Sequence, residues 1–110
     1  MALPNAERAI ADLEKLRDYC LNPDHPRGRH KARVFEAVLG FTSAHALELR
    51  AMLLIGARSG DAVPAEHDQY GQRYVVDFAA SGRNRAVIIR SAWIVRSGED
   101  FPRLTSCFIL

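Results

Sequence analysis

Ten residues, 24–33, carry the strongest chemical bias in this 110-residue sequence. Arg and Lys bind phosphate oxygens, the N–H groups that open a helix do the same, and histidine titrates near neutral pH. The stretch runs straight into an apolar helical pattern, so it suits a phosphodiester, although basic runs also occur as plain solvated surface. Its cations are Arg27, Arg29, Lys31 and Arg33, and its histidines are His25 and His30.

The positive charge of the chain is concentrated in this stretch. Fifteen Lys and Arg against 13 Asp and Glu give a net charge of only +2. The four cations of the stretch less Asp24 give +3, so the remainder is close to neutral. Any affinity for nucleic acid must therefore come from local clustering rather than from overall charge.

A second unusual charge lies in a predicted strand. Alternation over 86–95 puts Arg90 on one face with Ala86, Ile88, Ala92 and Ile94. A buried guanidinium is costly unless it is paired. Two interpretations remain open: Arg90 binds an internal carboxylate such as Asp77, or it points into a cleft that accepts an anion.

Several other classes of site lack their motifs. Cys20 and Cys107 have no CxxC spacing, so reduced core thiols are expected, with no metal site and no cofactor. The glycines form no phosphate loop, and no Gly-x-Ser-x-Gly elbow occurs. Neither a signal peptide nor an 18-residue apolar run is visible, so we expect a cytoplasmic chain with no membrane partner.

The length and composition, with 48% hydrophobic residues, predict one globular domain over 1–110. Its first half, about 7–60, is typical of helices. One helix begins at Asp12 as N-cap and ends before Pro23. A second runs from Arg29 to Leu39 with Gly40 as its stop, and a third runs from Thr42 or Ser43 to Gly60.

The second half, about 70–110, has the period of strands. After a break at 61–64, strands are predicted at 73–78, 86–95 and 103–109, with turns at 81–84 and 97–100. Helices followed by consecutive hairpins indicate an α+β fold in which N-terminal helices pack on one face of a small antiparallel β-sheet meander. The other face is left for a site.

The sequence resembles DUF6883, a family of small bacterial domains of unknown function. The stretches that carry the resemblance are Leu3-Pro4-Asn5-Ala6, Lys15-Leu16-Arg17-Asp18-Tyr19, Leu21-Asn22-Pro23-Asp24-His25-Pro26, His30-Lys31-Ala32-Arg33-Val34-Phe35, Gln69-Tyr70-Gly71-Gln72-Arg73-Tyr74, Arg90-Ser91-Ala92-Trp93 and Pro102-Arg103-Leu104-Thr105. Members resemble toxin modules of polymorphic toxins, including contact-dependent ones. This resemblance implies that the chain belongs to the group of barnase, EndoU, colicin and RelE-like ribonucleases, in which helices precede four antiparallel strands. Since the sequence pattern predicts three strands, the fourth is expected at 7–11 or 70–71.

That resemblance implies a metal-independent endoribonuclease. A base removes the proton of a ribose 2′-OH, the oxygen attacks the adjacent phosphate, and cations stabilise the added charge. His30 is the first candidate for base or acid. The other candidate catalytic residues are Lys31, Arg90 and Thr105, and the candidate substrate-binding residues are Arg27, Arg29, Arg33, Tyr70, Arg73, Trp93 and Arg103. Tyr70 and Trp93 could stack a base, with a core position as the alternative for Trp93.

The expected partners follow from this chemistry. The substrate is RNA, with tRNA and mRNA both open, and a small, acidic antitoxin or immunity protein is expected to cover 24–33 and the polar sheet face. The main alternative is a non-catalytic module that binds nucleic acid or protein. A further alternative is another enzyme class, such as a nucleotide-modifying toxin.

Overall fold

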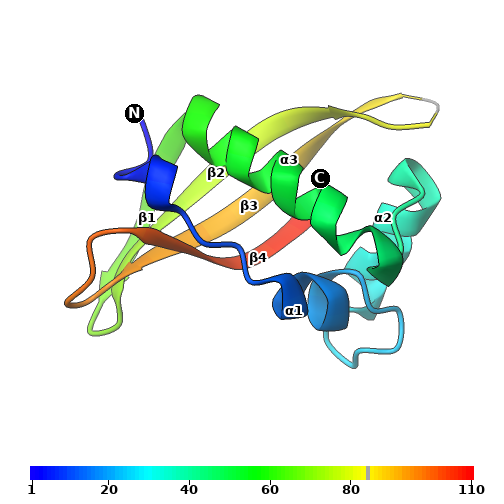
Figure 1. Cartoon of the computed structure of the whole chain (residues 1–110), viewed down its shortest axis with the longest axis horizontal. Coiled ribbons are helices and arrows are strands. Elements are labelled where there is room, and N and C mark those ends of the chain that lie inside the picture. Colours follow the sequence, from blue (N-terminus) through cyan, green and yellow to red (C-terminus); the bar gives the residue numbers. More distant parts are fainter. Residues whose placement is uncertain (84) are drawn as a thin grey trace.

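The computed structural model describes residues 1–83 and 85–110. Helical elements come first and a four-stranded antiparallel sheet follows, so the fold is α+β as predicted (Figure 1). The helical elements are η1 (Ala6–Arg8), α1 (Leu13–Lys15), η2 (Leu16–Cys20), α2 (Arg29–Leu39), η3 (Ser43–His45) and α3 (Ala46–Ser59), and the strands are β1 (Ala62–Asp68), β2 (Gly71–Ser81), β3 (Ala86–Arg96) and β4 (Pro102–Ile109).

Local signals set the helix ends. The Asp12 side chain accepts a hydrogen bond from the Glu14 N–H at 2.9 Å, which confirms its role as N-cap. The helix beyond it is a short α-helix continued by a π-helical turn, η2. Helix α2 has the predicted bounds, and Gly40 ends it at φ 74°, a left-handed conformation that glycine adopts without strain. A capping box between Thr42 and His45 opens the third helix.

The strand that the sequence did not identify is β1. It pairs with β2, and its first three residues fall in the segment 61–64, where the sequence predicts a break because of Pro64. Proline is accepted at a sheet edge, where its missing N–H is not needed, and β1 is one of the two edge strands. The expected fourth strand at 7–11 or 70–71 is therefore wrong: Ile10 makes only an isolated parallel bridge to Arg103, and Tyr70 lies in the β1–β2 turn.

The strands follow one another in the order β1-β2-β3-β4, with every pair antiparallel. The predicted turn at 97–100 joins β3 to β4, and Gly98 in it has φ 85°. The turn predicted at 81–84 includes Asn84, which lies outside the described residues. Between Ala92 and Trp93 the register against β4 shifts by one residue, and this bulge leaves Thr105 without a direct partner in β3.

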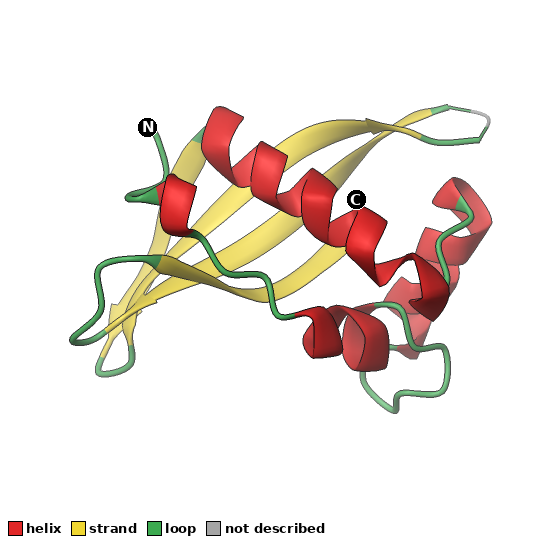
Figure 2. Ribbon diagram, in the orientation of Figure 1, coloured by secondary structure: helices red, strands yellow, loops and turns green. Residues whose placement is uncertain are grey.

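The two faces of the sheet are covered differently. Helix α3 runs across one face (Figure 2). The hydrophobic core contains Leu53 of α3 together with Val76, Ile89 and Trp93 of the sheet. No helix crosses the opposite face in the part of the chain that the structure describes. On that face Asp77, Arg90 and Phe108 lie side by side on three strands. The sequence predicted this open face.

Candidate functional site

The loop before α2 is held in place by His25. Its Nδ1 atom accepts hydrogen bonds from the backbone N–H groups of Arg27, at 3.0 Å, and Gly28, at 3.1 Å. Its ring lies 4.6 Å from that of Tyr19, measured between centroids. A Cβ on Gly28 would lie only 2.5 Å from the carbonyl oxygen of Tyr19, so glycine permits this close approach. The loop therefore presents the start of α2 in a defined position.

The first turn of α2 is basic and exposed. Arg29 and His30 are its first two residues, and both face solvent. Among the described residues, no carboxylate oxygen lies within 4.0 Å of any of four cations, which are Arg27, Arg29, Lys31 and Arg33. The N–H groups of His30 and Lys31 have no acceptor among those residues either. Because the N-terminal end of a helix is itself electropositive, this arrangement favours a bound anion.

Lys31 connects this turn to the open face of the sheet. Its Nζ lies 4.7 Å from the ring centroid of Phe108 in β4, a cation–π contact. Phe108 is the cross-strand partner of Arg90 in β3. The structure therefore links two of the predicted catalytic residues through Phe108: Lys31 contacts its ring, and Arg90 is its neighbour on the next strand. The sequence did not identify Phe108.

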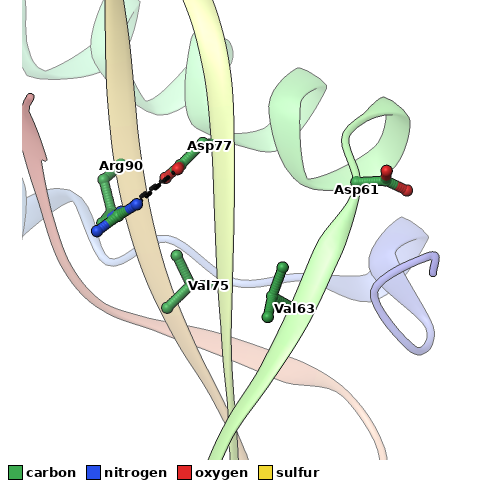
Figure 3. A pocket seen from close by; sticks show the side chains of 5 residues that line it. All are labelled: Asp61, Val63, Val75, Asp77 and Arg90. Carbon is green, nitrogen blue, oxygen red and sulfur yellow. Dashed lines mark hydrogen bonds and ion pairs between the residues drawn. The ribbon is translucent and has the colours of Figure 1, made fainter.

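The open face is hollowed beside Arg90. The hollow has a volume of about 370 Å³ and is lined by Asp61, Val63, Val75, Asp77 and Arg90 (Figure 3). Asp77 and Arg90 make a two-pronged ion pair, with Nε to Oδ1 at 2.9 Å and Nη2 to Oδ2 at 2.8 Å. Hydrogen bonds from Arg90 lower the pKa of Asp77, and desolvation opposes this only in part. The carboxylate partner that the sequence left open is thus Asp77.

This ion pair is not buried, although Arg90 alternates with apolar residues along β3. The Arg90 and Asp77 side chains remain 41% and 35% exposed because their face of the sheet is uncovered. We therefore expect Arg90→Ala to change the Tm by no more than about 3 °C, since exposed pairs contribute little. The lowered Asp77 pKa stabilises the folded state above about pH 4, and this contribution is lost as the pH falls.

Thermal melts of the wild type and Arg90→Ala at pH 7 and pH 3 measure this effect. The small difference at pH 7 should shrink as the pH falls below about 4 towards the lowered pKa of Asp77. A large drop in Tm at pH 7 would mean instead that the pair acts as a buried ion pair.

Three other candidate site residues on the sheet, two for substrate binding and one for catalysis, already have partners. The Nη2 atom of Arg73 lies 3.7 Å from Oδ2 of Asp68. Arg103 donates two hydrogen bonds of 2.9 Å to the carboxylate of Glu99. The Arg103 guanidinium also lies over the Phe101 ring. Thr105 donates its hydroxyl to the carbonyl oxygen of Ala92 at 3.1 Å. None of these three candidates lines the hollow beside Arg90.

The two aromatic candidates differ in exposure. Tyr70 is 63% exposed in the β1–β2 turn, where a base could stack on its ring. Trp93 is 0% exposed, and its Nε1–H donates to Ser91 Oγ at 2.9 Å. No base reaches a ring in that position, so the structure favours the core role of Trp93 over base stacking.

Further features bear on other classes of site. The described residues contain no group of three or more His, Cys, Asp or Glu that could hold a metal ion. Cys20 and Cys107 are free and buried, and a hydrogen bond with Cys20, together with burial, raises the pKa of Cys107. Within the same residues no single helix is long and apolar enough to cross a membrane. Helix α2 and the Ser43–Ser59 segment together have the length and composition of a membrane span, but they are bent by 73° relative to each other.

Almost the whole sequence matches a known family of protein domains. The family model described as "Domain of unknown function (DUF6883)" matches residues 2–110. The chain belongs to this family. No curated protein sequence matches this DUF6883 domain.

A solved structure has a similar fold. It is a contact-dependent growth inhibition toxin–immunity protein complex from Klebsiella pneumoniae 342. The similarity covers 94% of the DUF6883 domain and 95% of the chain compared, with a TM-score of 0.63 and 14% sequence identity. At this identity the likeness establishes a shared fold.

Proposed function

We propose that this chain is a toxin domain that cleaves RNA without a metal ion. The observation that carries the proposal is the unpaired basic turn at the start of α2, joined to an uncovered sheet face by the contact between Lys31 and Phe108. The fold shared with a chain of a toxin–immunity complex supports the toxin role. Helices that precede a four-stranded antiparallel sheet also agree with the barnase, EndoU, colicin and RelE-like group.

The proposed reaction uses the chain's own side chains. Neutral His30 removes the proton from a ribose 2′-OH, and the 2′-oxygen forms a bond to the adjacent phosphorus. The bond from phosphorus to the 5′-oxygen of the next nucleotide breaks, and that oxygen takes a proton from water, while His30 returns its own proton to the solvent. The products are a 2′,3′-cyclic phosphate and a 5′-hydroxyl. Lys31 and the free N–H groups of the first turn stabilise the charge that develops on the phosphoryl oxygens.

Arg90 has a different role in this proposal from the one expected from the sequence. Its guanidinium is oriented by Asp77 through two hydrogen bonds, so it is a fixed donor rather than a free clamp. Its side chain is partly exposed and lines the hollow, and Phe108 is its neighbour on β4. In this proposal Lys31 and Arg90 both contribute positive charge near a phosphate bound on the open face beside Phe108.

An inhibitory partner follows from the same surface. A ribonuclease with an open basic site would damage the cell that makes it, so we propose a small acidic immunity protein that covers 24–33 and the open sheet face. The solved structure with a similar fold contains a toxin together with an immunity protein. Because charge complementarity drives such association, higher salt should weaken it.

Induced expression in bacteria tests the proposal, followed by gel analysis of total RNA incubated with the purified protein. We expect growth arrest and RNA cleavage that persists in EDTA, because the mechanism needs no metal. Lys31→Ala should reduce cleavage strongly. Arg58→Ala removes an exposed cation from α3 and should have no effect. Intact RNA, or cleavage abolished by EDTA, would contradict the proposal.

A second candidate function has its own support. Arg73, Arg90 and Arg103 all hold carboxylates, which leaves fewer free cations on the sheet than catalysis of this type would use. A module that binds RNA without cleaving it is consistent with this. It predicts that the chain binds a single-stranded oligoribonucleotide and leaves it intact over hours.

A further inference from the structure

A second hollow lies at the edge of the sheet, where the segment before α1 runs along β4. Its volume is about 410 Å³, within the range of about 300–1,000 Å³ that is common for small-molecule sites. It shares no lining residue with the hollow beside Arg90. Its lining residues are Ile10, Ala11, Asp12, Leu13, Lys15, Arg50, Arg96, Arg103 and Leu104.

One wall of this hollow is fixed by backbone hydrogen bonds. The segment before α1 runs along β4, where the Ile10 N–H donates to the Pro102 carbonyl and the Leu104 N–H donates to the Ile10 carbonyl, both at 2.9 Å (Figure 1). Helix α3 supplies Arg50, and the end of β3 supplies Arg96. Secondary-structure elements far apart in the sequence therefore converge here.

The hollow is strongly cationic. Four of its lining residues are basic and one is acidic, a sum of +3, which the ion pair between Arg103 and Glu99 lowers to +2. The single acid, Asp12, already accepts the Glu14 N–H. Arg50 and Arg96 have no carboxylate oxygen within 4.0 Å among the described residues.

Such an arrangement has a physical consequence. Cations that converge on a concave surface repel one another and focus a positive potential into it, which concentrates anions there. Arg50 is half-buried, so its guanidinium is less screened than those of fully exposed residues. Lys15 is half-buried too, and its Nζ reaches the Leu104 carbonyl at 3.5 Å, at the limit of a hydrogen bond. Its other two N–H groups remain available to a ligand.

We propose that this hollow, formed by Lys15, Arg50, Arg96 and Arg103, is a phosphate-binding site. Guanidinium groups match the paired oxygens of a phosphate, and the volume accommodates a phosphate with its sugar. The ligand class is the phosphodiester of a single RNA strand. That last step rests on the proposed function, whereas the phosphate site itself does not. The site would hold a second phosphate of the substrate, away from the point of cleavage.

Two probes test this inference, with Arg50→Gln/Arg96→Gln as the variant and Arg58→Gln, on the same helix as Arg50, as the matched control. Inorganic phosphate added to ¹⁵N-labelled protein should shift the amide resonances of the lining residues. The shifts should be lost in the double variant and kept in the control. Should the double variant fail to fold, Arg96→Gln alone replaces it, because Arg96 is exposed at the end of β3. Phosphate shifts that are absent, or equal in all proteins, would overturn the site.

The second probe is a fluorescent 2′-O-methyl oligoribonucleotide, which cannot be cleaved because it lacks the attacking hydroxyl. The double variant should bind it at least 10-fold more weakly, and its slope of log K against log salt should be shallower by about 1.4, for two lost contacts to a single strand. The RNA assignment would be overturned if phosphate shifted the wild-type resonances and not those of the double variant, while both proteins bound the oligonucleotide equally tightly. If the wild type binds phosphate but no oligonucleotide, the proposed function fails and the phosphate site stands. Weaker binding of an acidic protein partner alone would make the hollow a protein interface and overturn the inference.

Discussion

Replacement of His30 by alanine should lower the rate of RNA cleavage by about 10²- to 10⁴-fold, the usual contribution of a general base. His30 is exposed in the first turn of α2, next to Lys31, whose side chain reaches the sheet. Its removal leaves no cavity, so the Tm should stay within about 2 °C of the wild type. Single-turnover cleavage of a short oligoribonucleotide measures the rate, and a thermal melt of the same sample measures the Tm.

The pH profile gives a readout that a structural role would not change. A general base acts only in its unprotonated form, so wild-type cleavage should rise with pH and then level off. His30→Ala should lose this rise. His67→Ala is the control, because His67 is exposed on the edge strand β1, away from α2. A fully active His30→Ala protein with an unchanged profile would remove His30 from the mechanism.

Much of the fold was predictable because local signals dominate it. The ends of α2 follow from apolar spacing and from a glycine that takes a left-handed conformation at Gly40. The two faces of β3 follow from simple alternation up to the bulge at Ala92. In contrast, β1 carries almost no pattern: after Ala62 every residue is exposed, and Pro64 interrupts it. Its pairing is set by the backbone of β2 rather than by its own side chains.

The site was predictable only in part. A charge among apolar residues singles out Arg90 in the sequence, and the structure pairs it with Asp77 at the lining of a hollow. The contact between Lys31 and Phe108 depends on the angle at which α2 meets the sheet edge, which no local spacing encodes. The cations of the second hollow are spread from Lys15 to Arg103, so no motif could reveal them. Residues that meet only through tertiary packing require the structure.

Trp93→Ala should have the largest effect on stability. The ring is 0% exposed in the core between α3 and the sheet, and truncation of a buried tryptophan costs about 3–5 kcal/mol through lost burial and the cavity that remains. For a chain of this size the Tm should fall by at least about 12 °C. The same change removes the indole N–H that hydrogen-bonds to Ser91, whose hydroxyl also donates to the Val76 carbonyl at 2.7 Å.

Two further variants separate the possible roles of the aromatic residues. Trp93→Phe keeps most of the buried ring and should recover much of the lost stability, because the cavity term is small. Tyr70→Ala changes an exposed side chain and should leave the Tm unchanged, while weakening RNA binding if a base stacks there. Thermal melts with oligonucleotide binding on all three variants decide the matter. If Trp93→Ala melted like Tyr70→Ala and lost RNA affinity instead, Trp93 would be a stacking platform and its place in the core would be wrong.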